Sequence, residues 1–163
     1  MLRKIKCNFI SVLVCISLQM FSTSYAHEID LKEISIKHPM IPIFNSKMKT
    51  AAGYFTIVNK RNKTDELIMV KTDFAKAMMH LSKIDENGIV SMEHVNKVII
   101  PGNSSVVFEQ GSLHIMFTQL KEPLEEYMDQ KVTLVFKNLG EIVVDFQVEK
   151  VTQKMNMKNN HDH

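Results

Sequence analysis

The feature that most limits the fold of this chain is a strict alternation of apolar and polar residues near its C-terminal end. Between Glu141 and Lys150 every second residue is apolar (Ile142, Val144, Phe146 and Val148), while Asp145, Gln147 and Glu149 stand between them. A period of two places these two sets on opposite faces of a strand, whereas a helix would mix them. The segment therefore predicts a β-strand with one buried face.

The rest of the chain consists of similar short alternating segments separated by turn residues. Lys131–Lys137 alternates similarly, and Asn138-Leu139-Gly140 predicts a hairpin between the two segments. Further strands are expected at Ile29–Ile36, Ala52–Asn59, Glu66–Thr72, Lys76–Ile84, Ile89–Val95, Ser105–Glu109 and Leu113–Leu120, with a short helical turn at Pro123–Asp129. Many short strands without intervening helices predict an all-β, antiparallel sandwich or barrel.

The first 26 residues have the pattern of a cleaved secretory signal. Basic residues near Arg3 precede the apolar segment Phe9–Phe21, and the small residues Ser24 and Ala26 occupy the positions that a signal peptidase inspects. The apolar segment is short for a membrane span. Cys15 follows Val14 rather than a small residue, which argues against lipid attachment. We expect a signal peptide at 1–26, one domain at 27–152 and a flexible tail at 153–163.

Removal of this signal changes both the redox chemistry and the charge of the chain. Both cysteines, Cys7 and Cys15, lie within it, so the mature chain has neither a thiol nor a disulfide. Three basic residues and no acidic ones are lost with it, which leaves 17 Lys+Arg against 18 Asp+Glu. The basicity of the full chain therefore gives no reason to expect nucleic acid as a partner.

The predicted strand at Leu113–Leu120 contains an imidazole and a thioether two positions apart. His114 and Met116 share one face of that strand, about 6.6 Å apart along the backbone, so both can approach one ion. The segments Ala77–Leu81 and Val90–His94 offer further ligands, and a hairpin through Asn87-Gly88 would bring these two segments together.

The spacing of four of these residues resembles the motif of the periplasmic copper chaperones called PCuAC. His80, Met92, His114 and Met116 are separated by eleven, 21 and one residues, as in that family. Ala51–Asn59 looks like the family's AAGYxxxxN strand, and Ile99–Gly102 and Gly111–Met116 look like its IPAG and GGxHIM segments. The resemblance extends from Leu31 to Val151. Leu81 departs from the acidic or polar residue that often follows the first histidine in that family.

The resemblance implies a Greek-key, cupredoxin-like β-sandwich that binds Cu(I) through His80, Met92, His114 and Met116. It implies a metallochaperone and not an enzyme, located in the periplasm of a Gram-negative bacterium and at most peripheral to the membrane. Its partners would be a copper-accepting subunit of a respiratory oxidase or another copper chaperone, and we expect a monomer. Thioether and imidazole donors suit Cu(I) better than hard cations, and they avoid the oxidation to which exposed thiols are prone.

Several metal-capable residues lie near this motif or outside it. Met92 and His94 are two positions apart, as His114 and Met116 are, but in the reverse order. We interpret His94 as a supporting or surface histidine, or as a competing ligand. At least one of Met78 and Met79 is expected to pack in the core. Alternation turns Glu93 away from Met92, which disfavours zinc.

Two terminal features are auxiliary candidates. The tail contains Met155, Met157, His161 and His163, which is typical of a flexible copper arm that could hold Cu(II) as well, or of an ordinary solvated terminus. Cleavage after Ala26 would make His27 the mature amino terminus, where its amine and ring could chelate Cu(II).

Three other functions remain open from the sequence. One is a copper-dependent redox enzyme that uses His27, the second a copper-buffering or resistance protein, and the third a structural sandwich with incidental methionine and histidine residues.

Overall fold

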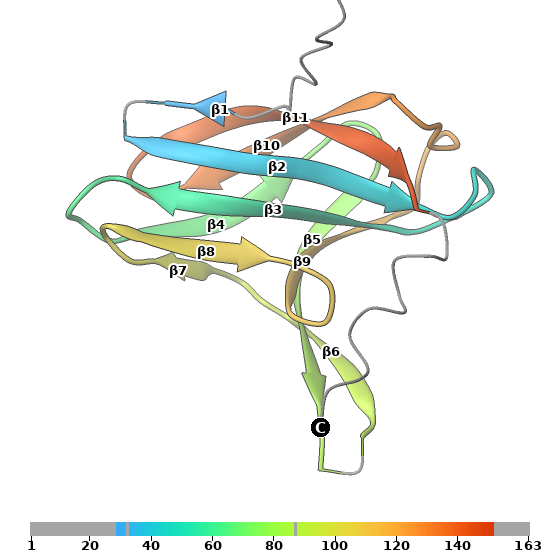
Figure 1. Ribbon diagram of the computed structural model, residues 1–163, viewed down its shortest axis with the longest axis horizontal. Helices are drawn as coiled ribbons and strands as arrows, with labels where there is room; N and C mark the ends of the chain where they lie inside the picture. Colours follow the sequence, from blue (N-terminus) through green and yellow to red (C-terminus); the bar gives the residue numbers. More distant parts are fainter. Residues whose placement is uncertain (1–28, 32, 87, 152–163) are drawn as a thin grey trace, which may run out of the picture.

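The protein is described from a computed structural model that covers residues 29–31, 33–86 and 88–151. These residues form eleven strands and no helix, which confirms the all-β expectation (Figure 1). The strands are β1 Ile29–Asp30, β2 Ile34–Ile43, β3 Ala51–Asn59, β4 Asp65–Lys71, β5 Lys76–Ile84, β6 Val90–His94, β7 Val98–Ile100, β8 Ser104–Phe108, β9 Leu113–Thr118, β10 Asp129–Phe136 and β11 Gly140–Lys150. Within these ranges no helix has the length and apolar character needed to cross a membrane. The predicted signal peptide and tail lie outside the described residues.

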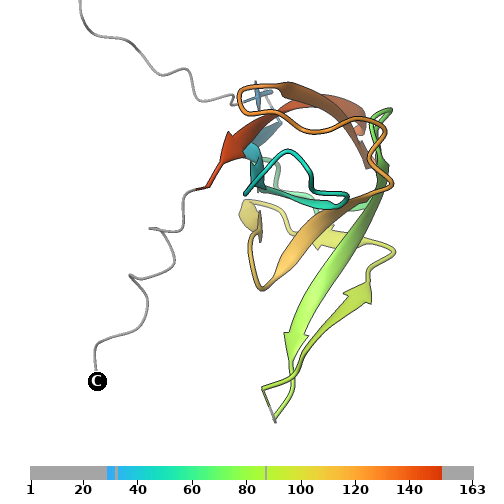
Figure 2. The ribbon, with the colours of Figure 1, turned by 90° about the vertical axis from the view of Figure 1, so that its right-hand side faces the viewer.

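The strands form one curved, mostly antiparallel sheet. Hydrogen-bonded neighbours follow the order β6-β5-β9-β3-β2-β11-β10-β4-β7, with β1 beside β2 and β8 beside β3. β11 and β2 run parallel. β3 is shared, because Ala51–Gly53 pairs with β9 and Phe55–Asn59 pairs with β8. Figure 2 shows the strands wrapped around a common interior, with the β5–β6 hairpin extending beyond it.

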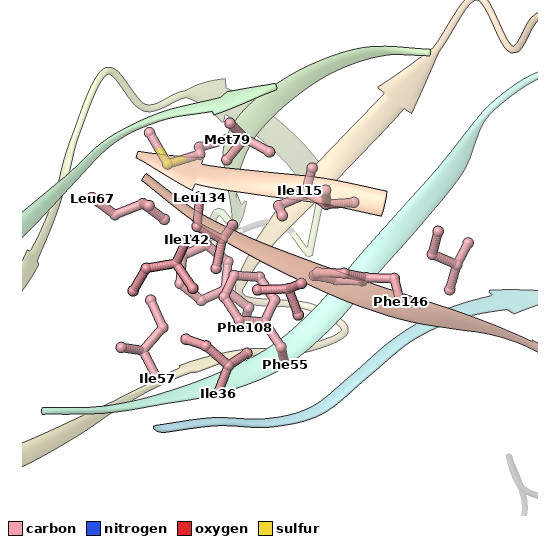
Figure 3. Close-up of a cluster of buried hydrophobic side chains, with 14 of the residues drawn as sticks. Ile36, Phe55, Ile57, Leu67, Met79, Phe108, Ile115, Leu134, Ile142 and Phe146 are labelled. Atoms are coloured by element: carbon pink, nitrogen blue, oxygen red, sulfur yellow. The ribbon is translucent and has the colours of Figure 1, made fainter. Parts of the chain in front are cut away.

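Alternate apolar residues of these strands fill the interior. The side chains of Ile142, Val144 and Phe146 on β11 are buried, as the alternation predicts. The rings of Phe55 and Phe108 stack with centroids 4.3 Å apart, and Phe146 meets Phe55 edge-on at 5.3 Å (Figure 3). Burial of each such side chain contributes about 1.5–3 kcal/mol, so aromatic and aliphatic packing holds these strands together without a disulfide.

β2 is longer than predicted. We expected this strand to end at Ile36, but it continues to Ile43. His38 has a φ of 49°, and the register with β3 shifts between Lys37 and Met40. These are the marks of a β-bulge, a position at which a sheet tolerates proline. The residues around Pro39 therefore interrupt the ladder locally and do not end the strand.

The helical turn predicted at Pro123–Asp129 is wrong. The segment contains a single turn, in which the Met128 N–H donates to the Glu125 carbonyl at 3.2 Å, and Tyr127 has a φ of 69°. The Tyr127 N–H donates to the Val148 carbonyl on β11 at 2.9 Å. The backbone groups that a helix would satisfy internally are thus satisfied by the neighbouring strand.

The last residues of two sequence motifs, Asn59 and Gly102, meet at neighbouring loops. Asn59 is buried, and its Nδ2 donates to the carbonyls of Lys63 at 2.9 Å and of Ile100 and Pro101 at 3.2 Å. A Cβ on Gly102 would lie 2.6 Å from the carbonyl carbon of Asn62. Both residues therefore serve the fold, by joining the loop after β3 to the loop after β7.

Asp65 anchors the same region through its carboxylate. It is buried, accepts hydrogen bonds from the backbone N–H groups of Glu66 at 2.8 Å and Asn138 at 3.0 Å, and pairs with Arg61 at 2.5 Å. Burial raises the pKa of this carboxyl, but these hydrogen bonds and the Arg61 charge outweigh burial, and the net pKa lies below its ordinary value of 3.8. The charged form is therefore the one that the fold favours.

This carboxylate makes part of the stability dependent on pH. A lowered pKa in the folded state contributes stability above the unfolded value, and that contribution is lost as pH falls through the folded value. We expect Asp65→Asn to destabilise the protein at pH 7 and the difference from the unsubstituted protein to shrink below about pH 4. Urea unfolding at a series of pH values measures this. Asp145→Asn, at a half-exposed ion pair with Lys131, is the control, and a difference for Asp65→Asn that does not vary with pH would contradict the assignment.

Candidate metal centre

Three adjacent strands, β6, β5 and β9, bring the predicted ligands together. The expected hairpin between β5 and β6 is present, since these two strands pair antiparallel from Ile84–Val90 to His80–His94. On the other side of β5, His80 lies directly opposite His114 of β9. His80 therefore stands between two other histidines, one on each neighbouring strand.

The register places all four predicted ligands on one face of this sheet. Met92 lies opposite Ser82 and Met116 opposite Met78, both of which share the face of His80. The intervening residues Met79 and Ile115 point into the core and are buried. Met79 is thus the packing residue of the Met78-Met79 pair, as expected.

His114 is the most deeply placed of the four. Its residue exposure is 5%, and its Nδ1 lies 3.0 Å from the carbonyl oxygen of Ser112. A carbonyl only accepts hydrogen bonds, so Nδ1 carries the proton in neutral His114. This hydrogen bond orients the ring and leaves the lone pair of Nε2 available to a metal.

His80 has a polar atom without a partner. Its Nδ1 is buried and makes no hydrogen bond to the described residues. Burial, and then the positive charges that His114 and His94 can bring, lower the pKa of His80 below its ordinary value. Neutral imidazole is the form that binds metals, so a buried, unpaired nitrogen between two other imidazoles fits a metal ligand.

A groove of about 440 Å³ holds the other three predicted ligands. His114, Met92 and Met116 line it, together with Met48 from the loop after β2. Met92 is 57% exposed, so the groove is accessible from solvent at the β6 side. The Sδ of Met48 accepts a hydrogen bond from the Phe44 N–H at 3.4 Å. Sequence reasoning missed Met48, because a single methionine in a loop has no periodic signal.

His94 lies on the same face as the predicted ligands. It is exposed, and its ring centroid is 5.8 Å from that of His80, close to the 5.9 Å between His80 and His114. Glu93 projects from the opposite face of β6, as expected, and pairs with Lys83. The auxiliary candidates His27, Met155, Met157, His161 and His163 lie outside the described residues.

The donor set is imidazole and thioether. Among the described residues, no three histidine or acidic side chains approach closely enough to hold one ion. The side-chain donors on this face include the thioethers of Met78, Met92 and Met116 beside the imidazoles. Such a soft donor set favours Cu(I) over magnesium, calcium or zinc.

Residues 34–148 match the model of the LpqE-like family, whose description reads "Putative lipoprotein LpqE-like". A curated relative, an uncharacterized protein of Rickettsia prowazekii named RP573, is 30% identical over 103 residues. The aligned part is 63% of this chain and 57% of that protein, so the chain spans little more than half of its relative's length.

Solved structures with a similar fold are PCuAC domains. The copper-bound PCuAC domain from PmoF2 is 24% identical with a TM-score of 0.64, over 77% of this chain and 99% of that chain. The apo PCuAC domain from PmoF1 has the same identity and a TM-score of 0.66, over 77% and 100%. The Cu(I) form of DR1885 from Deinococcus radiodurans is 20% identical with a TM-score of 0.58, over 78% and 83%. The resemblance stated from the sequence is thus confirmed for the fold, which is that of PCuAC domains.

Proposed function

This chain belongs to the LpqE-like family, and from that premise we propose that it is a copper carrier that works outside the cytoplasm and binds Cu(I) through His80, Met92, His114 and Met116. The observation that supports this most directly is the pairing of His80 with His114 across β5 and β9. Met92 and Met116 share their face, and both line the groove beside His114. Two solved structures of the same fold contain copper, the PmoF2 domain and the Cu(I) form of DR1885.

The ligands suit transport better than catalysis. Two neutral imidazoles and two neutral thioethers stabilise Cu(I), and with all four bound the ion has no open position for a substrate. The groove is open to solvent at Met92, so an acceptor can approach the ion and replace ligands one at a time. We therefore assign a carrier role and no catalytic step.

The proposal includes a location and a partner. The signal pattern at 1–26 and the lipoprotein description of the family both agree with export from the cytoplasm. Within that compartment we propose the periplasm, with a copper-accepting subunit of a respiratory oxidase or another copper chaperone as the acceptor. A copper-buffering protein would bind the ion equally well and would not transfer it.

Titration of the mature protein with Cu(I), in competition with a bicinchoninate chelator, tests the proposal. We expect one tightly bound equivalent whose X-ray absorption spectrum shows two nitrogen and two sulfur neighbours. We also expect transfer of that ion to the soluble copper-binding domain of an oxidase subunit. Failure to compete with the chelator would reject copper carriage, whereas tight binding without transfer would favour buffering.

A further inference from the structure

A second group of soft donors lines a hollow that shares no lining residue with the groove. A hollow of about 200 Å³ between β4 and the β5–β6 hairpin is lined by His94 of β6, Met78 of β5 and Met69 of β4. This is one imidazole and two thioethers, the same donor types that His114, Met92 and Met116 bring to the groove. Met69 lies on β4, which pairs with β10 and β7 and not with β5, so only the folded chain assembles this group.

His80 connects the two groups of donors. Its ring centroid is 5.8 Å from that of His94 and 5.9 Å from that of His114. With metal–nitrogen bonds of about 2 Å, two imidazoles on one ion have ring centroids roughly 5 to 6 Å apart, the larger value for a nearly linear pair. His80 is therefore spaced to share an ion with either neighbour, and its buried Nδ1 has no competing hydrogen bond to the described residues.

The two groups differ in the exposure of their histidines. His114 is only 5% exposed, whereas His94 is exposed, and each group has one exposed methionine, Met92 at 57% and Met69 at 51%. An exposed side chain is mobile, so fixing it on an ion costs side-chain entropy and lowers the affinity for the ion. An ion beside His94 would be held more weakly and exchanged more easily than one beside His114.

We propose that His94, Met69 and Met78 form a second, weaker Cu(I) position, and that His80 lies between it and the primary position so that copper passes from one to the other by exchange of ligands. The choice of Cu(I) rests on the proposed function. At each stage His80 stays bound while His94 is replaced by His114, or the reverse, so the ion keeps an imidazole ligand throughout. The hollow is then the point at which copper enters or leaves.

Stoichiometric Cu(I) titration of the mature protein, with competing chelators of two strengths and methyl-labelled methionine followed by NMR, tests this position. We expect a second equivalent that shifts the methyl signals of Met69 and Met78 after those of Met92 and Met116 have shifted. In Met69→Leu/His94→Asn, affinity for the second equivalent should fall by more than about tenfold. Affinity for the first should change by less than about twofold.

Matched controls separate this inference from the proposed function. His38→Asn and Met128→Leu remove an exposed histidine and an exposed methionine that belong to neither group, and both equivalents should be unaffected. Circular dichroism checks that each variant is folded. A second equivalent that survives Met69→Leu/His94→Asn, or methyl signals of Met69 and Met78 that never shift, would overturn the second position. Loss of the first equivalent in His114→Asn would still support the proposed function in either case.

Discussion

Replacing Met92 and Met116 together by leucine is expected to lower the affinity for the first Cu(I) equivalent by more than about 100-fold, or about 2.7 kcal/mol. Both sulfur atoms of the proposed site are lost, and two imidazoles alone hold Cu(I) less well than four ligands. Leucine nearly conserves the volume of methionine, so the groove keeps its shape and the fold is retained. Chelator competition gives the affinity, and X-ray absorption should show that the two sulfur neighbours have gone.

Met128→Leu is the control for this pair, because it removes an exposed thioether that does not line the groove. Its Cu(I) affinity should equal that of the unsubstituted protein. The single variants should each fall between the two, with Met116→Leu the more damaging because Met116 is less exposed than Met92. An unchanged affinity in the double variant would show that sulfur at these positions does not hold the ion.

Asn59→Asp is expected to reduce the free energy of unfolding by about 3 kcal/mol or more at pH 7. The side chains have almost the same shape, so no cavity is made. The amide nitrogen that donates to the carbonyls of Lys63, Ile100 and Pro101 is replaced by a negatively charged oxygen. Three carbonyl oxygens would then face a buried carboxylate in place of the amide donor. Equilibrium unfolding in urea measures the loss.

Asn45→Asp makes the same chemical change at an exposed site. Asn45 uses its Oδ1 to accept a hydrogen bond from the Lys47 N–H at 3.0 Å, which a carboxylate can also accept. We expect its free energy of unfolding to change by less than about 0.5 kcal/mol. An equal loss of unfolding free energy in the two variants would mean that the hydrogen bonds of Asn59 do not hold the loops after β3 and β7 together.

Elements that depend on local pattern were predictable from the sequence. The alternation at Glu141–Lys150 predicts β11 and its buried face, because side-chain direction in a strand depends only on position parity. The β10–β11 and β5–β6 hairpins follow from short turns between alternating segments. Met79 in the core and Glu93 turned away from Met92 follow from the same parity.

Elements that depend on distant partners were not predictable. β2 continues past His38 because Met40–Ile43 finds β11 as a parallel neighbour, and Pro123–Asp129 is not helical because Tyr127 bonds to Val148. β7 is three residues long, too short for any periodic signal. In each case the backbone bonds to a strand that lies elsewhere in the chain, and local preference gives way to that pairing.

The candidate site divides in the same way. The residue spacing and its resemblance to a known motif determined which histidines and methionines to consider, and strand parity determined that His114 and Met116 share a face. Only the tertiary structure decided that His80 stands between His94 and His114, and that Met48 and Met69 join the donors on either side. The physical reason is that the parity of a residue's position specifies only the face of the strand on which its side chain lies. Its neighbours on that face depend on which strands pair and in what register. Packing of the whole core sets that pairing.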